Sequence, residues 1–519
     1  MNAPHPSGRQ YDVAIIGGSL SGAATAILLL RDNPSLRVLV VEKATQFTRK
    51  VGEATVEVSA FFLGRVLDLT QHLNESHLVK QGMRFWFSNQ QAHSLADCSE
   101  IGPRYQVRLP AYQVDRSVLD EEVLRRAVAM GITLMRPAKV SRVQLCDGGE
   151  QTLTIQHGDE TQQINARWVV DASGFAAQLA RQEGWHRLNE EHPTCAVWSR
   201  WRGVKDWDSR ALAAKFPVWG QASFGLRSTA TNHLTGDGWW AWWIPLKGGD
   251  VSIGVVYDQR RMEWPKGGSQ GQKLKDFLSL HPAGKELLAD ATWIDGDVHV
   301  RRQLPYSSTR FAGDGFALVG DAAAFMDPLY SPGMDWITYT VCRSVDLIAA
   351  QQRGESVAPL VAKHNRDFRR SYDRWFEAVY KDKYEYLGEY DLMRLAFTMD
   401  LGFFYLGIVS QPFKRGEVAL REPVFMTPPS TPFFYFMRGY NRRFASIASA
   451  RRERRALGRQ NAGKRFLFPG FSLEPASGKL LVKAIVGWGL LELTEGWRTW
   501  FRGRKKEAAE SHVAAPTSA

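Results

Sequence analysis

The sequence has little cysteine, and none of it is arranged in pairs. Its 519 residues include four cysteines, Cys98, Cys146, Cys195 and Cys342, without C-x-x-C spacing. This pattern excludes a disulfide framework and a thiolate metal site, and we expect four buried thiols. The sequence also lacks an H-E-x-x-H motif and a nucleophile elbow. We therefore predict no metal site and exclude metal-dependent and serine hydrolysis.

Long apolar runs are absent as well. No stretch of about 18 uninterrupted apolar residues occurs, so we expect no membrane-spanning helix. The segment Met1–Gln10 is polar and has no apolar core of a signal peptide, which predicts a cytoplasmic protein. A chain of 519 residues is too long for one compact core and predicts two or three packed units.

Acidic residues are outnumbered, with 54 Asp and Glu against 66 Lys and Arg, a net charge of +12. Basic pairs concentrate in the last third of the chain, from Arg442-Arg443 to the run Arg502 to Lys506. Such a surface attracts an acidic carrier protein or an anionic membrane, and it also serves simply to keep a protein soluble. We predict no nucleic-acid partner and leave peripheral membrane contact by the C-terminal region open.

The hydrophobic pattern predicts an α/β fold with a Rossmann-like dinucleotide-binding domain. Residues Tyr11–Ile16 and Arg37–Val41 form apolar strands around an Ala/Leu-rich helix that ends near Leu30. Further strands at Trp168–Val170 and Phe316–Val319 make this domain discontinuous. Alternating apolar residues and many tryptophans between these parts predict an inserted antiparallel β-sheet for the substrate. We assign 8–80, 107–185 and 304–350 to the dinucleotide domain, 81–106 and 186–303 to the sheet, 351–505 to a C-terminal helical region, and 506–519 to a disordered tail.

A glycine turn, Gly17-Gly18-Ser19-Leu20-Ser21-Gly22, lies between the first strand and its helix, and Glu42 closes the next strand. Glycines at such a turn let a pyrophosphate approach the helix N-terminus, and the acid bonds ribose hydroxyls. Ser19 stands where a second glycine is usual. We predict that Gly17, Gly18, Ser19, Gly22 and Glu42 bind a nucleotide.

Two later turns indicate which nucleotide is bound. Asp171-Ala172-Ser173-Gly174 and Gly320-Asp321-Ala322-Ala323 each follow a strand, as in flavoproteins. In FAD enzymes of this fold the aspartate of the second turn meets a ribityl hydroxyl, and the next helix points its N-terminus at the flavin. We therefore predict FAD rather than NAD, held in part by Asp171, Gly320 and Asp321.

Three segments resemble the signatures of flavin-dependent halogenases. Gly52-Glu53-Ala54-Thr55 is similar to G-E-A-T, Trp240 to Pro245 to W-x-W-x-I-P, and Phe325 to Gly333 to F-x-x-P-x-x-S-x-G. They occur in the family's order and span the first two-thirds of the chain. The resemblance implies that Glu53, Ala54 and Thr55 contact FAD, that Trp240, Trp242, Ile244 and Pro245 shield the flavin, and that Ser331 and Gly333 lie against it near the halide.

The resemblance also implies a chemistry. In this family reduced FAD (FADH2) reacts with O2 to a hydroperoxide, a bound chloride or bromide converts it to hypohalous acid, and this acid travels through a tunnel to a lysine beside the substrate. Lys80 corresponds to that lysine. An ammonium can hydrogen-bond hypohalous acid or, if burial lowers its pKa, react to a haloamine. A separate flavin reductase is implied as partner.

Two residues depart from the family pattern and bear on halide binding and on the expected substrate. Pro332 has no N–H to point at a halide. Tyr330 stands where enzymes acting on free tryptophan have a glutamate, so a phenol, pyrrole or polyene-like aromatic, free or tethered to a carrier protein, is the expected substrate. Two alternatives stay open: an FAD-dependent monooxygenase or dehydrogenase on the same scaffold, and a carrier- or membrane-bound flavoprotein whose C-terminal region is an interaction module.

Overall fold

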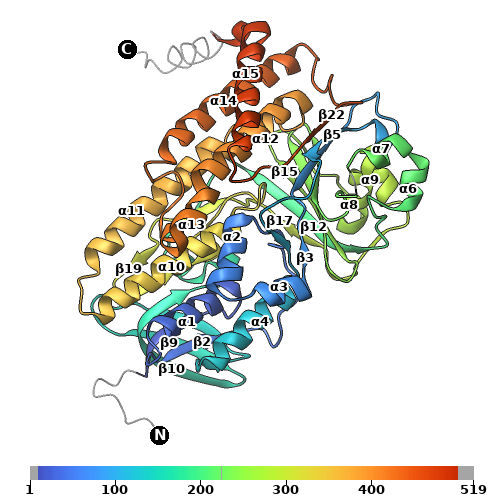
Figure 1. Cartoon of the computed structure of the whole chain (residues 1–519). Coiled ribbons are helices and arrows are strands. Elements are labelled where there is room, and N and C mark those ends of the chain that lie inside the picture. Colours follow the sequence, from blue (N-terminus) through green and yellow to red (C-terminus); the bar gives the residue numbers. More distant parts are fainter. Residues whose placement is uncertain (1–9, 224, 501–519) are drawn as a thin grey trace, which may run out of the picture.

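The structure is a computed structural model that describes residues 10–223 and 225–500. Two large β-sheets make up its framework, and long helices from the last third of the chain pack against them (Figure 1). This arrangement confirms the predicted α/β class with a second sheet and a helical C-terminal region. The predicted tail, 506–519, lies outside the described residues.

The first sheet is the dinucleotide sheet, with strand order β19-β20-β10-β1-β2-β7 and with β9 and β8 continuing from β10. The central strand β1 pairs in parallel with β2 and β10, and β10 pairs in parallel with β20. Strands from three distant parts of the sequence therefore form one sheet. Their bounds are β1 Tyr11–Ile16, β2 Val38–Val41, β7 Thr133–Met135, β8 Lys139–Gln144, β9 Gln151–His157, β10 Glu160–Asp171, β19 Ala312–Gly313 and β20 Phe316–Leu318.

Helices α1 (Leu20–Asp32), α4 (Arg116–Ala129) and α10 (Gly333–Gln352) pack together beside this sheet. The helix α1 is rich in alanine and leucine, and its buried residues include Ala23, Ala24 and Ile27. Small side chains let α1 lie close to the sheet and to both neighbouring helices. This close packing fixes the N-termini of α1 and α10 at the carboxyl edge of the strands, where nucleotides bind in such folds.

The second sheet has strand order β16-β12-β15-β14-β13-β4-β5-β22, with β17 on β12. Most pairs are antiparallel as predicted, but β13–β4 and β22–β5 are parallel. The bounds are β4 Met83–Phe87, β5 Ser99–Pro103, β12 Thr194–Arg202, β13 Thr231–Gly236, β14 Trp239–Pro245, β15 Val251–Asp258, β16 Thr292–Trp293, β17 His299–Arg301 and β22 Arg465–Phe468. Two small sheets join β11 (His186–Leu188), β18 (Tyr306–Ser308) and β21 (Ala324–Phe325), and β3 (Leu78–Val79) with β6 (Tyr112–Gln113).

The last third of the chain, predicted as a helical region over 351–505, is helical except for the short strand β22, which the sequence did not indicate. Four residues, Arg465–Phe468, are too few to give a strand period in sequence, and the edge of β5 supplies the pairing. The helices are α11 Ala358–Trp375, α12 Tyr390–Phe404, α13 Ser410–Arg415, α14 Thr431–Glu453 and α15 Ala476–Thr494, with π-helical turns at η5 Phe376–Tyr380 and η7 Tyr405–Val409. Shorter helices are α2 Glu57–Phe61, α3 Thr70–Ser76, α5 Gln178–Gln182, α6 Arg210–Lys215, α7 Pro217–Gln221, α8 Gln270–Ser279 and α9 Pro282–Leu287.

Within the described residues, one helical segment, Tyr390–Arg421, is long and apolar enough to cross a membrane. Of its most apolar window, 72% is buried inside the protein, as in a core helix. Three of the four predicted buried cysteines are buried, but Cys146 is exposed in the turn before β9. That prediction was wrong for Cys146 because a turn at a sheet end leaves its side chains in solvent.

Candidate functional site

The glycine turn is required by the packing of the chain itself. Gly17 has a φ of +98°, and a Cβ there would lie 2.6 Å from the carbonyl oxygen of Ala172. A Cβ on Gly22 would lie 1.9 Å from the carbonyl oxygen of Gly17. Ser19 is the N-cap of α1, so its side chain is accommodated where a second glycine is usual. The turn therefore brings two strands and the α1 N-terminus into close approach.

Glu42 lies against this turn at the end of β2. Its carboxylate accepts the N–H of Gly18 at 2.8 Å and the N–H of Ala44 at 2.8 Å. Asp171 is likewise held by the chain, because its two oxygens accept the N–H groups of Ser173 and Leu179 at 2.9 and 2.8 Å. The Asp171 carboxylate thus shapes its own turn, and a direct contact between this group and FAD stays a prediction.

The second flavoprotein turn opens onto a cavity, which we call the dinucleotide-side cavity. Asp321 lines it, whereas Gly320 packs behind with its N–H donating to Thr340 at 2.8 Å. Burial raises the pKa of Asp321 to about 6, and the nearby guanidinium groups of Arg116 and Arg301 oppose that rise. The cavity also receives Gly52, Glu53 and Ala54 from the loop before α2.

The loop Gly52–Thr55 is held between the second large sheet and the small β3–β6 sheet. Glu53 forms a buried ion pair with Arg200 of β12 at 2.6 Å, and Thr55 accepts the N–H of Tyr112 at 2.6 Å. Ala54 bridges to Gln113 of β6. With its side chain paired to Arg200, Glu53 acts in this structure as a clamp that holds the loop at the cavity.

The tryptophan motif occupies β14, and strand alternation decides which of its residues face the cavity. Trp240, Trp242 and Ile244 point into the dinucleotide-side cavity, whereas Ala241 and Trp243 pack in a separate tryptophan-rich core on the other face. The Trp240 indole donates to Tyr384 at 2.8 Å and Tyr384 donates to Asp327 at 2.7 Å, which fixes its ring. Pro245 ends the strand and is not among the residues that line the cavity, and its role in shielding the flavin stays a prediction.

The segment Phe325–Gly333, which we call the strap, forms the opposite wall. Tyr330 and Ser331 have positive φ values of 69° and 59°, a strained conformation for residues with side chains. As a result, Tyr330 faces a second cavity, Ser331 and Gly333 face the dinucleotide-side cavity, and Pro332 lines both. Of the three residues Ser331, Pro332 and Gly333, the first donates its N–H to the carbonyl of Pro328 at 3.0 Å and the second has no N–H. Gly333, in the first turn of α10, therefore carries the backbone N–H that is free among these three in the described structure.

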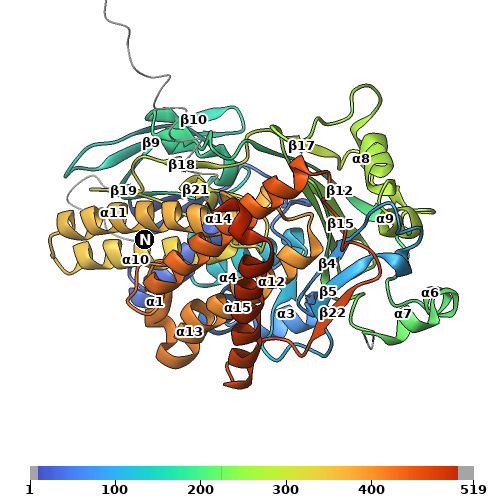
Figure 2. The same cartoon turned by 90° about the horizontal axis from the view of Figure 1, so that it is seen from above.

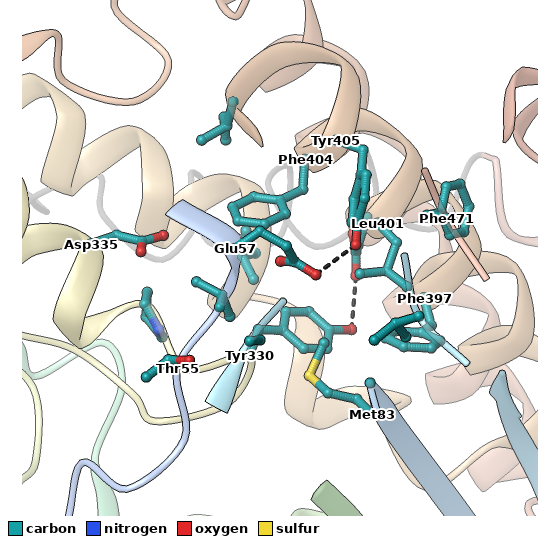
Figure 3. Close-up of a pocket in the computed structure, with 18 of the residues that line it drawn as sticks. Thr55, Glu57, Met83, Tyr330, Asp335, Phe397, Leu401, Phe404, Tyr405 and Phe471 are labelled. Carbon is teal, nitrogen blue, oxygen red and sulfur yellow. Dashed lines mark hydrogen bonds between the residues drawn. The ribbon is translucent and has the colours of Figure 1, made fainter. Parts of the chain in front are cut away.

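Lys80 lines the second cavity, which we call the Lys80 cavity. Figure 3 shows Glu57, Tyr330 and Asp335 among the side chains around this cavity. It lies between the strap, α2, and the helical C-terminal region, and aromatic side chains such as Phe397, Phe404 and Phe471 line it. The Lys80 ammonium donates to the Thr55 carbonyl at 2.9 Å and is 2% exposed. Burial lowers the pKa of Lys80 to about 8, while Glu57 and Asp335 oppose this shift.

Three carboxylates line the Lys80 cavity, and they differ in how they are held. Asp400 accepts hydrogen bonds from Tyr330 at 2.9 Å and Lys383 at 2.7 Å, and Glu57 accepts one from Tyr405 at 2.5 Å. Both Asp335 oxygens are buried; the hydroxyl and the backbone N–H of Ser59 lie near enough to lower the pKa of Asp335, but neither forms a well-aligned hydrogen bond to it within residues 10–223 and 225–500. Burial, and then the charge of Glu57, raises the pKa of Asp335 to about 8.

Glu57 and Asp335 bear on the argument that Tyr330, in place of a glutamate, leaves Lys80 without an acidic neighbour. Tyr330 removes the glutamate of the family motif, but Glu57 from α2 and Asp335 from α10 place acids beside Lys80 by another route. Asp335 follows Gly333 by two residues, so its place in the first turn of α10 could have indicated a residue facing the strap. Arg116, which lines the dinucleotide-side cavity, was also not predicted from the sequence. Asp115 caps α4 by accepting the N–H of Ser117 at 2.9 Å. Such a cap predicts where a helix starts, but it does not predict the direction of the next side chain.

The residues present fit FAD. Arg116 supplies a cation for phosphate, Trp198, Trp240 and Trp242 supply flat apolar walls, and a Cβ on Gly333 would meet no atom within 4 Å, so space is open before the first turn of α10. Within the described residues no cluster of three His, Cys, Asp or Glu side chains is arranged to hold a metal ion.

Comparisons with known proteins point to one family of enzymes. A family model described as tryptophan halogenase matches residues 12–108 and 100–382. The chain is 26% identical over 387 residues to the flavin-dependent halogenase armH3 of Armillaria mellea, which covers 71% of this chain and 73% of that protein. It is 28% identical over 393 residues to the sulochrin halogenase gedL of Aspergillus terreus, covering 71% and 68%. The match to the flavin-dependent halogenase chlA of Dictyostelium discoideum spans 58% of that protein's length.

Solved structures have the same fold. The chain aligns with the crystal structure of the halogenase PltM in complex with phloroglucinol and FAD at a TM-score of 0.74 and 19% identity, over 92% of this chain and 97% of that one. The flavin-dependent brominase Bmp2 aligns at a TM-score of 0.61 and 20% identity, over 83% and 99%. The predicted resemblance to flavin-dependent halogenases is thereby confirmed.

Proposed function

The chain belongs to the tryptophan halogenase family, and from that premise we propose that it uses FADH2, O2 and chloride or bromide to halogenate an electron-rich aromatic compound. Family membership makes it a flavin-dependent oxidoreductase, and a separate flavin reductase supplies the reduced cofactor. We place the reaction in the cytoplasm, where such reductases work, and we assign the FAD contacts to the residues of the glycine turn, Asp321 and the dinucleotide-side cavity.

One observation carries this proposal: Pro332 lines both cavities, so a single layer of the strap separates the flavin from Lys80. An enzyme that transfers oxygen directly from flavin to substrate needs the two in one chamber. Here the substrate chamber is a different cavity, and its cation is a buried lysine. The separation favours a small oxidant that passes the strap, as hypohalous acid would.

Bound reduced FAD supplies that oxidant together with O2 and the halide. Lys80 then holds it, because the ammonium uses one N–H on Thr55 and has two more to donate to the hypohalous oxygen. The aromatic carbon bonds to the halogen as the halogen–oxygen bond breaks, and the leaving hydroxide takes a proton from the Lys80 ammonium to become water. The ring then loses its proton, which returns to Lys80 after its acceptor has taken it up. Asp335, which is buried in the same cavity, has a raised pKa and has no well-aligned hydrogen bond in the described residues, is the acceptor we assign to that proton.

A phenol fits the Lys80 cavity best. Its walls are aromatic and aliphatic, while Lys80, Glu57 and Asp335 provide polar groups at one side. A phenol ring is activated by its own hydroxyl and does not need the glutamate that Tyr330 replaces. The fold shared with a halogenase solved with phloroglucinol supports the same class, as does the similarity to sulochrin halogenase.

The test is mass spectrometry of turnover by the purified protein with FAD, a flavin reductase, bromide or chloride, and a panel of free and carrier-tethered phenols, pyrroles and indoles. We expect halide-dependent replacement of hydrogen by halogen on a free phenol. Products on carrier-tethered compounds alone would move the proposal to a carrier-bound substrate. Halide-independent gain of oxygen, with NADPH oxidised by the isolated protein, would make it a monooxygenase and contradict the proposal.

A further inference from the structure

The helix α15 and the turn after it carry large apolar side chains that face solvent. Six of them, Val482, Val486, Leu490, Leu493, Trp497 and Trp500, are each between 50% and 70% exposed. Four of them, Val482, Val486, Leu490 and Leu493, lie on α15, and their spacing of four, four and three residues places them within an arc of about 80° at 3.6 residues per turn. They form one stripe, about 17 Å long at 1.5 Å per residue, and Trp497 and Trp500 follow in the turn after the helix. We call it the α15 stripe.

Charge is distributed unequally around the same helix. The acids Glu492 and Glu495 face the protein, where Glu492 pairs with Arg443 at 2.9 Å and Glu495 pairs with Arg451 at 2.8 Å, both on α14. The exposed charges of this segment are Lys479, Lys483 and Arg498, all positive. The sequence continues with Arg502, Arg504, Lys505 and Lys506. The exposed charges beside the α15 stripe, which we call its basic border, are therefore positive, whereas the acids of the same segment face the protein.

We propose that the α15 stripe is an interfacial membrane anchor, which lies flat on a bilayer containing anionic lipid. Apolar side chains over about three helical turns, with flanking lysines and two tryptophans in the turn that follows, are typical of helices that bind such a surface: the stripe enters the acyl boundary and the cations contact the headgroups. A two-fold pairing of two such helices would bring their basic borders together without an acid to match them. A continuous apolar stripe also suits a planar acyl boundary better than an acidic carrier protein.

The anchor is placed next to the Lys80 cavity. Gly470 and Phe471 line that cavity, and α15 begins at Ala476, five residues later. The helix runs along the outer side of the C-terminal helices with α12 beneath it (Figure 2), and α12 supplies Phe397, Leu401 and Phe404 to the cavity. A membrane-bound molecule thus holds the cavity's helical wall close to the bilayer, where apolar aromatic compounds accumulate.

The experiment is flotation of the full-length protein with phosphatidylcholine vesicles that contain or lack phosphatidylglycerol, at low and high salt. We expect binding to the anionic vesicles that weakens as salt screens the basic border. The double variant Leu490→Glu, Leu493→Glu should reduce this binding by about tenfold or more, since each change removes buried apolar area and adds repulsion. The matched control is Val218→Glu, Leu280→Glu, because these side chains are 77% and 81% exposed, lie away from α15 and receive the same charge change.

Both double variants should retain wild-type circular dichroism and turnover of a water-soluble phenol, so a loss of binding is separable from unfolding and from a failed halogenase assignment. The proposal is overturned if the wild-type protein does not float with anionic vesicles, or if the Leu490→Glu, Leu493→Glu variant floats as well as the control. The proposal is also overturned if light scattering shows that the wild-type protein is a dimer and that the Leu490→Glu, Leu493→Glu variant is a monomer, because the stripe would then bind a second copy of the chain.

Discussion

Lys80 is a charged side chain that is almost fully buried. The loss of solvent around its ammonium group lowers the free energy of unfolding, although the proposed function needs that charge. Burial lowers its pKa from 10.5 to about 8, so the unfolded chain binds the proton more tightly than the folded one. The cost to folding is complete below pH 8 and fades as the pH rises to 10.5. We predict that Lys80→Met raises the free energy of unfolding at pH 7 by about 2 kcal/mol, measured by urea titration, and that this gain shrinks at pH 10. Equal stability of both proteins at pH 7 would contradict it.

Asp335 and Lys80 line the same cavity, and burial shifts their pKa values in opposite directions: it raises that of Asp335 to about 8 and lowers that of Lys80 to about 8. As a proton acceptor Asp335 must be ionised, so activity should rise as the pH approaches 8 from below, whereas the ammonium of Lys80 is lost above that value. We expect a bell-shaped pH profile of kcat centred near pH 8. Asp335→Asn should lower kcat and flatten the acidic limb while FAD binding is kept; an unchanged limb would remove Asp335 from the proton path.

Pro332 removes one backbone donor from the strap. Its φ of −76° is ordinary, so alanine fits the same backbone and restores an N–H beside the flavin. A hydrogen bond to a charged partner contributes about 1.5–3 kcal/mol, so Pro332→Ala should lower the apparent KM for halide by about tenfold or more. Pro328→Ala, in the same strap and lining the same cavity, is the control. A halide KM that stays the same in Pro332→Ala would place the halide elsewhere.

At the scale of elements, the glycine turn joins β1 to α1 with no room for a side chain. A Cβ on Gly22 would lie 1.9 Å from the carbonyl oxygen of Gly17, so Gly22→Val must displace the turn that faces the nucleotide. We expect this variant to be purified without FAD, as judged by flavin absorbance. The control Gly439→Ala, on α14 where a Cβ meets no atom within 4 Å, should keep full occupancy. Normal FAD content in Gly22→Val would contradict the assignment of the turn.

The elements also explain which parts of the site could be read from sequence. The β14 motif indicated Trp240, Trp242 and Ile244 on the cavity face because alternation along a strand is a local property, whereas Pro245 stands at the strand end and is not among the cavity-lining residues. The strand β22 is defined by its neighbour β5, and Asp335 meets Lys80 only after α10 and α2 pack together. Such long-range encounters leave no periodic signal in the chain.

At the scale of the whole molecule, the fold holds two cavities apart, and in the proposed function this separates a reactive flavin from an oxidisable substrate. The dinucleotide sheet and β14 enclose one cavity, the C-terminal helices enclose the other, and the strap from Phe325 to Gly333 is the wall between them. Tyr330 connects this wall to α12 through its hydrogen bond to Asp400, so the C-terminal third helps to fix the strap. In the proposed function, Lys80 is the point at which the oxidant meets the substrate.

The central claim is that Lys80 directs a halogenating species made at the flavin. The measurement that tests it most directly is a single turnover with reduced FAD, O2, bromide and a phenol, followed by mass spectrometry of the phenol, for the wild-type protein and Lys80→Met. The account predicts brominated phenol from the wild type and none from Lys80→Met, with equal FAD content and equal flavin reoxidation. Brominated phenol from both proteins in equal yield would contradict it.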